Sequence, residues 1–374
     1  MALSEDTAGA FAPRSVVVTG GAGFIGSNLV RWLLEQEPAL EVIVLDSLTY
    51  AGNLASLRSS ARAHGPDGDG RFYFVHGDIC DGAITAGLLA GGMAEPGTGR
   101  RLPTPDAILH LAAESHVDRS IIGPAAFVTT NVQGTLSLLE SVRHELARAP
   151  RGFRVVNVST DEVYGSLGPT DAAFTERHPL QPNSPYSASK AGADCLVRAY
   201  HETFGLPCIT TRCSNNYGPY QYPEKLIPLM ITRALGDQPL PVYGDGLNVR
   251  DWLHVRDHCA ALWTVMTLGK PGDVFNIGGD CERRNVDIVK AILAALGKPE
   301  SLIQFVRDRP GHDRRYAMDA GTLEQQLGWQ PVERFEPALQ ATIEWYLSNR
   351  TWWESILREE HREWQDPYRL IDAR

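Results

Sequence analysis

The stretch that decides the fold is Thr19-Gly20-Gly21-Ala22-Gly23-Phe24-Ile25-Gly26, in which Gly20, Gly23 and Gly26 have G-x-x-G-x-x-G spacing. It follows the β-branched run 15–19, which is typical of a buried parallel strand, and opens the run 24–35, where apolar residues recur at helical spacing. Between a strand and a helix, such glycines indicate a dinucleotide site, because they let a pyrophosphate approach the backbone and the helix N-terminus.

Five further runs suit strands and alternate with helical stretches: 42–45, 72–75, 107–111, 155–158 and 208–211. Together they predict an α/β fold, a doubly wound parallel (Rossmann) sheet with helices on both faces. After about Cys213, Pro and Gly become denser and the alternation weakens, which predicts a smaller C-terminal substrate-binding domain. Two Gly-, Pro-, Asp- and Arg-rich stretches, 59–70 and 91–105, are interpreted as loop expansions.

We divide the chain into four parts. Residues 1–13 are expected to be a disordered extension, 14–212 the Rossmann domain, 213–350 mainly the substrate side interlaced with the first domain, and 351–374 a helical tail.

Composition excludes several classes of protein. The 374 residues carry 35 Lys and Arg against 45 Asp and Glu, a formal net charge of −10, which argues against a dedicated nucleic-acid binder. No run reaches the roughly 18 apolar residues of a membrane helix. The first residues hold acids and no basic region, unlike a secretory signal, so we expect a cytoplasmic protein.

The cysteines and histidines do not suggest a metal centre. The six cysteines are scattered without a C-x-x-C pair, which favours buried free thiols in a reducing compartment. His254 and His258 are four residues apart, but no third ligand is indicated, so no metal is expected.

Acidic residues after two of the predicted strands suggest which dinucleotide binds. Asp46 lies about 20 residues after Gly26, where an acid hydrogen-bonds the adenosine ribose and repels a 2′-phosphate. This position favours NAD over NADP, although Asp46 as a simple loop cap is the alternative. Asp78 follows the third run and is placed to reach the adenine, or else is a loop carboxylate. Small residues in 111–115 let the backbone pass close to the cofactor.

A tyrosine and a lysine share one helix face. Ser184 and Pro185 are typical of an N-cap and a first helical position, and Tyr186 and Lys190 follow at i,i+4 spacing. A lysine ammonium beside a phenol lowers the phenol pKa, so Tyr186 is expected to accept a hydroxyl proton while hydride leaves carbon.

Two adjacent carboxyl groups follow the fifth predicted strand. Asp161 and Glu162 come after Thr160 at the carboxyl end of 155–158, where sites in such sheets lie. Neighbouring carboxyls with different pKa values can serve as separate acid and base, which the elimination of water requires. The alternative is that both are acids at a helix N-terminus.

These motifs, together with four longer strings, carry a resemblance to a known family. The strings are HLAAESHVDRS (110–120), RCSNNYGPYQ (212–221), NVRDWLHV (248–255) and DRPGHDRRY (308–316). From about Arg14 to Tyr346 the chain resembles the extended short-chain dehydrogenase/reductases, and among them the dTDP-glucose 4,6-dehydratases. The Asp161-Glu162 pair discriminates most, because related epimerases and decarboxylases usually carry Ser- or Ala-type residues there.

The resemblance implies a reaction. Tyr186, assisted by Lys190 and Thr160, removes the 4-hydroxyl proton of dTDP-glucose while the C4 hydride passes to NAD. Glu162 then abstracts the C5 proton, Asp161 protonates the departing C6 hydroxyl, and hydride returns to C6. The products are dTDP-4-keto-6-deoxy-glucose and water, a hydro-lyase reaction of deoxysugar biosynthesis that regenerates NAD.

The resemblance also implies two sets of binding residues. Cofactor contacts fall on Gly20, Gly23, Phe24, Ile25, Gly26, Asp46, Ser47, Leu48, Thr49, Asp78, Ile79, Leu111, Ala112, Ala113, Ser115, Thr130, Tyr186, Lys190 and Asn216. Nucleotide-sugar contacts fall on Ser115, Thr160, Asn215, Lys225, Leu226, Pro241, Val242, Tyr243, Arg250, Asn285, Asp308, Arg309, Pro310, Gly311 and His312. Arg250 and Arg309 suit a bidentate grip on diphosphate oxygens, and Tyr243 offers an aromatic surface to a base.

Other interpretations stay open at this point. A 4-epimerase or decarboxylase of the same fold is disfavoured by Asp161 and Glu162, and a non-catalytic NAD-binding regulator would have no use for them. UDP-glucose is not distinguished from dTDP-glucose by these residues. We expect a homodimer and no nucleic-acid or membrane partner.

Overall fold

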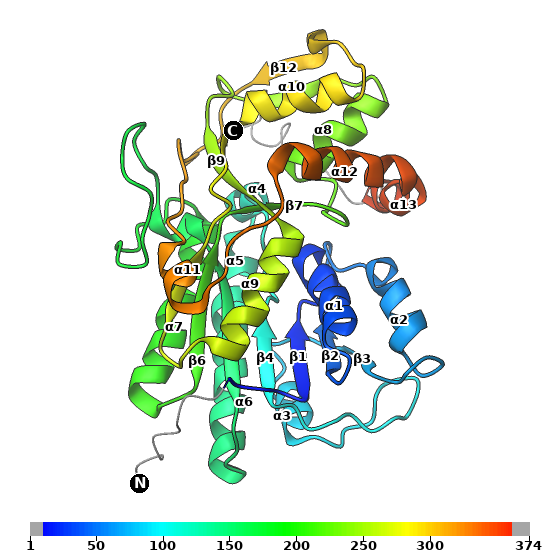
Figure 1. The fold of residues 1–374 in the computed structure, drawn as a ribbon, viewed down its shortest axis with the longest axis vertical. Coiled ribbons are helices and arrows are strands. Elements are labelled where there is room, and N and C mark those ends of the chain that lie inside the picture. The colour runs from blue at the N-terminus through cyan, green and yellow to red at the C-terminus, as the bar shows by residue number, and fades with distance from the viewer. Residues whose placement is uncertain (1–9, 361–374) are drawn as a thin grey trace.

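The computed structural model describes residues 10–360, and its centre is a seven-stranded parallel sheet (Figure 1). The strand order is β10-β6-β5-β4-β1-β2-β3, the order 3-2-1-4-5-6 of a dinucleotide-binding sheet with one strand added at the β6 edge. The bounds are β1 Ser15–Thr19, β2 Glu41–Asp46, β3 Phe72–His76, β4 Ala107–His110, β5 Arg154–Thr160, β6 Cys208–Cys213 and β10 Val274–Ile277.

Helices cover both faces of this sheet, because its strands are apolar on both sides. Val16 and Val18 of β1 pack with α1 and α9 on one face, whereas Val17 packs with α3, α6 and α7 on the other. The bounds of these helices are α1 Phe24–Gln36, α3 Gly82–Ala90, α6 Thr135–Arg148, α7 Pro185–Phe204 and α9 Val255–Leu268. Shorter segments complete this part: η1 Leu54–Leu57, α2 Arg58–His64, α4 Val117–Ile122, α5 Pro124–Phe127, η2 Val128–Gly134, η3 Asp161–Tyr164 and α11 Gly321–Leu327.

A second core lies beyond the carboxyl ends of the strands, at the top of Figure 1. We call it the C-terminal lobe, and it packs Ile231, Trp252, Ile292 and Tyr346 together with its other apolar side chains. Its helices are α8 Leu226–Leu235, α10 Asn285–Ala295, α12 Phe335–Ser348 and α13 Arg350–Glu360, with the short η4 Glu300–Leu302. Its strands form two small sheets, β11-β9-β7 and β12-β8: β7 Asn215–Tyr217, β8 Leu240–Tyr243, β9 Val249–His254, β11 Glu282–Arg284 and β12 Ile303–Val306.

The structure confirms the predicted fold class and all six predicted strands, and it adds β10. This four-residue strand follows α9 and pairs with residues 210–213 of β6, so chain from beyond residue 212 completes the large sheet. Local sequence did not reveal it, because the polar Asn276 interrupts the run 274–277, which lies in the region where the strand–helix alternation weakens.

Several smaller expectations are corrected. The stretch 59–70 is not only a loop expansion, because α2 occupies 58–64. Cys195 is exposed on α7 rather than buried, although all six cysteines are free as expected. Residues 1–9 and 361–374, the ends of the predicted extension and tail, lie outside the described residues. Within 10–13, Phe11 packs against the core and its backbone N–H donates to the Thr267 carbonyl.

Candidate active site

The glycine turn after β1 forms the floor of a cavity at the carboxyl edge of the sheet. Gly20 has φ +69°, and a Cβ there would lie 2.7 Å from the backbone nitrogen of Ala112, which follows β4. A Cβ on Gly26 would collide with the carbonyl oxygen of Gly20. The turn therefore packs directly onto the start of α1 and onto the segment after β4, at the point where the strand order reverses.

Asp46, the last residue of β2, is fixed by two backbone hydrogen bonds. Its carboxylate accepts from the Ala22 N–H and from the Leu48 N–H, each at 2.8 Å. Burial raises the pKa of Asp46, and the two hydrogen bonds oppose that rise. Asp46 therefore holds the glycine turn and also lines the cavity.

The cavity gathers all the predicted cofactor residues except one. Leu48 lies outside the lining and packs against the core of the large sheet. Those that line it are Gly20, Gly23, Phe24, Ile25, Gly26, Asp46, Ser47, Thr49, Asp78, Ile79, Leu111, Ala112, Ala113, Ser115, Thr130, Tyr186, Lys190 and Asn216.

Sequence reasoning missed two tyrosines in the same lining. Tyr50 and Tyr222 meet edge to face, with ring centroids 5.6 Å apart, and the Arg119 guanidinium lies 4.0 Å from the Tyr50 ring centroid. Tyr50 follows Thr49, the last residue of the predicted cofactor segment. Tyr222 comes from the distant 213–225 stretch, and no local motif marked it.

Tyr186 and Lys190 lie on one face of α7, whose start is built as predicted. Ser184 caps the helix with a reciprocal Ser184–Ser187 capping box, and Pro185 is its first residue. The Lys190 ammonium donates to the Val158 carbonyl at 2.8 Å. Thr160 lines the same cavity as Tyr186.

The expected lowering of the Tyr186 pKa is wrong for this arrangement. Burial raises the pKa of Tyr186 well above its usual value, and the carboxyl of Glu162 adds to the rise. Burial also lowers the pKa of Lys190. Burial therefore decides the direction in which the phenol pKa shifts.

Asp161 and Glu162 open the 3₁₀ turn η3, capped by Thr160, whose hydroxyl oxygen accepts from the Glu162 N–H. Both carboxyls line the cavity beside Tyr186 and Lys190. Asp161 is 2% exposed, accepts from the Thr160 hydroxyl at 3.1 Å, and has one buried carboxyl oxygen without a hydrogen bond in the structure. Asp161 and Glu162 do lie in the first turn of a helix, as the alternative interpretation expected, but the residue that caps it is Thr160.

The two carboxyls differ in electrostatic surroundings. Burial, followed by the charge of Glu162, raises the pKa of Asp161 well above its usual value. Burial also raises the pKa of Glu162, but the cations Arg309, Arg250 and Lys225 oppose this rise. Asp161 therefore tends to keep its proton, while Glu162 ionises more easily, a separation suited to an acid and a base.

Four of the predicted nucleotide-sugar residues line the cavity: Ser115, Thr160, Asn215 and Lys225. The Lys225 ammonium donates to the Ser115 carbonyl at 2.8 Å, which joins two of them. The other predicted contacts lie outside the lining: Leu226, Pro241, Val242, Tyr243, Arg250, Asn285, Asp308, Arg309, Pro310, Gly311 and His312.

The guanidinium of Arg250, which was predicted to bind the diphosphate, is hydrogen-bonded to the protein backbone. Its guanidinium donates to the carbonyls of Val249 and Asp313, at 2.7 and 3.0 Å, and lies over the Tyr316 ring. Two of its terminal N–H groups are therefore used by the fold, and its charge acts on Asp161 and Glu162.

No group of three or more His, Cys, Asp or Glu side chains able to hold a metal ion exists within residues 10–360. His258 instead hydrogen-bonds the side chain of Asn216 at 2.9 Å. Over the same residues, no helix is long and apolar enough to cross a membrane.

Comparison with known proteins identifies the family. The family model described as GDP-mannose 4,6 dehydratase matches residues 17–342. A dTDP-glucose 4,6-dehydratase from Xanthomonas campestris is 53% identical over 359 residues, which cover 92% of this chain and 97% of that protein. The chain belongs to the dTDP-glucose 4,6-dehydratase family.

Other members of the dTDP-glucose 4,6-dehydratase family agree with this assignment. One from Escherichia coli is 49% identical over 365 residues, covering 91% of this chain and 96% of that protein. The crystal structure of one from Streptomyces venezuelae, with NAD bound, is 50% identical with a TM-score of 0.82, covering 91% of this chain and 99% of that one. A UDP-glucose 4-epimerase from Thermotoga maritima shares the fold more distantly, at 27% identity and a TM-score of 0.77, covering 90% and 99%.

Proposed function

We propose that this chain catalyses the NAD-dependent dehydration of dTDP-glucose to dTDP-4-keto-6-deoxy-glucose. The observation that carries the proposal is the pairing of Asp161 and Glu162 beside Tyr186 in one cavity, with different surroundings for the two carboxyls. A 4-epimerase needs only oxidation and reduction at C4, so it has no use for a second acid and base. A regulator that only binds NAD needs neither.

The residues of the cavity fit NAD. Gly20 and Gly26 have no side chains, and a Cβ at either position would clash with backbone atoms. The glycine turn therefore lies directly against the first turn of α1, with no side chain between them. Diphosphate oxygens can therefore reach the free N–H groups at the start of α1. Asp46 lies at the end of β2, where a carboxylate binds ribose hydroxyls and repels a 2′-phosphate.

Tyr186 is proposed to remove the proton of the sugar 4-hydroxyl. When bound, NAD supplies a positively charged ring that accepts hydride from C4 and later delivers it to C6. Thr160 lines the cavity together with Tyr186 and is proposed to assist it at the 4-hydroxyl. Lys190, anchored on the Val158 carbonyl, lies on the same face of α7, and we propose that its ammonium stabilises the phenolate against the rise in pKa that burial causes.

Glu162 and Asp161 are proposed to divide the elimination between them. Once C4 is a ketone, the C5 proton is acidic, and Glu162 removes it because Arg309, Arg250 and Lys225 favour its carboxylate. Asp161 gives its proton to the departing C6 hydroxyl, since burial and Glu162 favour its neutral form. A protonated Glu162 can then return a proton to C5.

The substrate side is proposed to recognise the nucleotide diphosphate. Ser115, Asn215 and Lys225 line the cavity near the catalytic groups. Arg309 and Tyr243 come from the C-terminal lobe and are assigned to the diphosphate and the base. Arg250 supplies charge to the carboxyl pair from its buried position.

The decisive experiment is incubation of the purified protein with dTDP-glucose, followed by mass spectrometry. Loss of one water from the substrate is the expected result, with UDP-glucose in a parallel reaction to measure nucleotide preference. An Asp161→Ala, Glu162→Ala double variant is the control, because it retains the cofactor site without the acid and base. Absence of a dehydrated product from both sugars would refute the proposal, and a 4-epimer would favour the epimerase.

We also propose that the protein is a cytoplasmic homodimer. Its substrate side, mainly residues 213–350, is proposed to be interlaced with the Rossmann domain 14–212, in line with the return of β10 to the large sheet. Large exposed apolar side chains on adjoining segments, Ile122, Val128 and Leu136, support a surface for a second copy. The six free thiols agree with a reducing compartment. Light scattering of the purified protein tests the dimer, and a monomer at micromolar concentration would refute it.

A further inference from the structure

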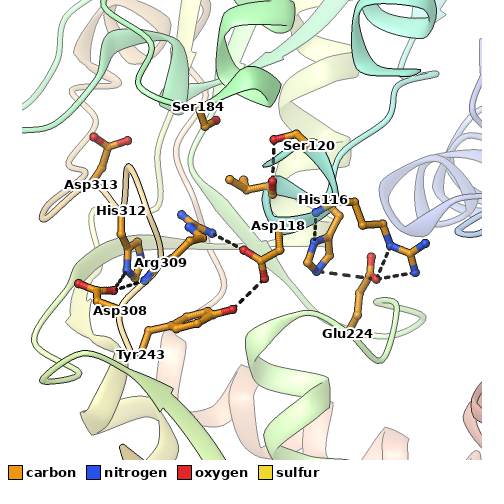
Figure 2. Close-up of polar contacts among 12 residues, drawn as sticks. His116, Asp118, Ser120, Ser184, Glu224, Tyr243, Asp308, Arg309, His312 and Asp313 are labelled. Carbon is orange, nitrogen blue, oxygen red and sulfur yellow. Dashed lines mark hydrogen bonds and ion pairs between the residues drawn. The ribbon is translucent and has the colours of Figure 1, made fainter. Parts of the chain in front are cut away.

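Three segments distant in sequence meet at the carboxylate of Asp118. Asp118 lies in the first turn of α4, Tyr243 ends β8, and Arg309 belongs to the loop after β12. The Tyr243 hydroxyl donates to Asp118 Oδ2 at 3.0 Å, and an Arg309 terminal nitrogen lies 3.5 Å from Asp118 Oδ1 (Figure 2). One carboxylate therefore holds two side chains of the C-terminal lobe, one on each of its oxygens.

Asp118 and its partners, Arg309 and Tyr243, are packed within the protein and not free in solvent. Asp118 is 5% exposed, and the Arg309 side chain is 14% exposed. The ring of His312 meets the ring of Tyr243 edge to face at 5.8 Å, and His312 is hydrogen-bonded to Asp308 at 2.6 Å. Asp308 also accepts from the backbone N–H of Arg309, so the loop and the tyrosine form one connected group.

The segment that carries Asp118 is itself anchored at the cavity. Arg119, the next residue, forms an ion pair with Glu224 at 3.1 Å, and His116 lies 3.7 Å from the same carboxylate oxygen (Figure 2). Glu224 is next to Lys225, and both residues line the cavity. Asp118 thus connects a fixed part of the active-site wall to side chains of the other lobe.

We propose that Asp118 is a positioning residue, which orders Arg309 and Tyr243 for the diphosphate and base of the substrate before it binds. The inference rests on the proposed function, which assigns those two side chains to the nucleotide. Without Asp118, a flexible arginine and a tyrosine from different segments would have to be ordered during binding, at a cost in affinity. Asp118 itself need not touch the sugar or the reacting atoms.

The test compares Asp118→Asn and Asp118→Ala by KM and kcat for dTDP-glucose. Asp118→Ala removes both contacts and should raise KM about tenfold at nearly unchanged kcat, because only ordering of the nucleotide site is lost. Asp118→Asn keeps an oxygen that can accept from Tyr243 but removes the charge that attracts Arg309. It should therefore weaken competitive inhibition by dTDP and leave inhibition by thymidine unchanged, whereas Asp118→Ala weakens both.

A double-mutant cycle with Tyr243→Phe gives a second readout. The hydroxyl of Tyr243 acts through Asp118, so the KM effects of Asp118→Ala and Tyr243→Phe should be less than additive. Additive effects would overturn the proposal.

The matched control is Glu140→Gln on α6. Glu140 also accepts from a tyrosine hydroxyl, that of Tyr200, and pairs with an arginine, Arg143, but it lies outside the cavity lining. It should leave KM unchanged. An equal rise in KM for Glu140→Gln, a fall in kcat without a rise in KM, or tighter dTDP binding by Asp118→Asn would each refute a positioning role. Turnover by the unmodified chain tests the proposed function separately, so the two failures are distinguishable.

Discussion

Replacing Asp161 by Asn should slow the reaction at the step that follows removal of the C5 proton. Asn has nearly the same shape and can still accept the Thr160 hydrogen bond at 3.1 Å, but it has no carboxyl proton to donate. Because burial raises the pKa of Asp161 and so favours a neutral side chain there, the neutral Asn should not disturb folding. The lost function is therefore general acid catalysis alone.

The expected loss follows from the role. A positioned general acid typically contributes about 10²–10⁴ in rate, or roughly 3–5 kcal/mol of barrier, so kcat for the dehydrated product should fall by that factor. Reaction in deuterated water supplies the diagnostic. Glu162 still exchanges the C5 proton in the variant, so recovered dTDP-glucose should carry deuterium at C5.

The comparison variant is Glu162→Gln, which lacks the base and should return substrate without deuterium at C5. Mass spectrometry of recovered substrate and product distinguishes the two variants in one experiment. Dehydration by Asp161→Asn within tenfold of the unmodified chain would refute the assigned role. Equal C5 deuteration of substrate by both variants would refute the division of labour between the two carboxyls.

Four further outcomes are expected. The pH profile of kcat/KM should be bell-shaped, because activity is lost when Glu162 takes up a proton at low pH and when Asp161 loses its proton at high pH. Both limbs should lie above the usual pKa range of carboxyl groups, because the pKa of each residue is raised. A flat profile would contradict this. Gly26→Ala should purify with little nucleotide, because its Cβ collides with the Gly20 carbonyl, whereas the unmodified protein should release NAD, not NADP, on denaturation. Burial raises the pKa of Asp251 from 3.8 to about 6, so the folded state holds a proton that the unfolded state releases, and stability should fall by about 2 kcal/mol as pH rises from 4 to 6. Urea unfolding of Asp251→Asn should lack that part of the pH dependence. A mixture of C4-labelled and unlabelled dTDP-glucose should give product in which label moves from C4 to C6 within one molecule, and crossover between molecules would argue against a retained cofactor.

Local patterns predicted a set of residues that the structure brings to one cavity. The glycine turn, Asp46 and the Tyr186–Lys190 pair each depend on residues close together in the chain, and the structure gathers all of them in one cavity. The capped start of α7 was also predictable, because Ser184 and Pro185 are local signals. Leu48 was included by resemblance as part of the segment 46–49, and it packs against the core outside the cavity lining.

The properties that local sequence could not predict depend on tertiary packing. The pKa of Tyr186 on α7 is set by burial and by Glu162, which lies in the turn η3 after β5. Arg250 has the charge of a diphosphate ligand, but backbone carbonyls occupy two of its terminal N–H groups. The contacts of Asp118 join residues 125 and 191 positions apart, a separation that no motif spans.

The return of the chain to the large sheet as β10 makes the two lobes inseparable by simple truncation. A chain cut after residue 213 would lose the partner of β6 and would expose the backbone N–H and C=O groups of residues 210–213 as an unpaired edge, a template for aggregation. It would also lose α9, which covers the same face of the sheet as α1. To exchange nucleotide specificity between relatives, it is therefore better to replace two separate segments, one between β6 and α9 and one after β10, than to join two whole domains end to end.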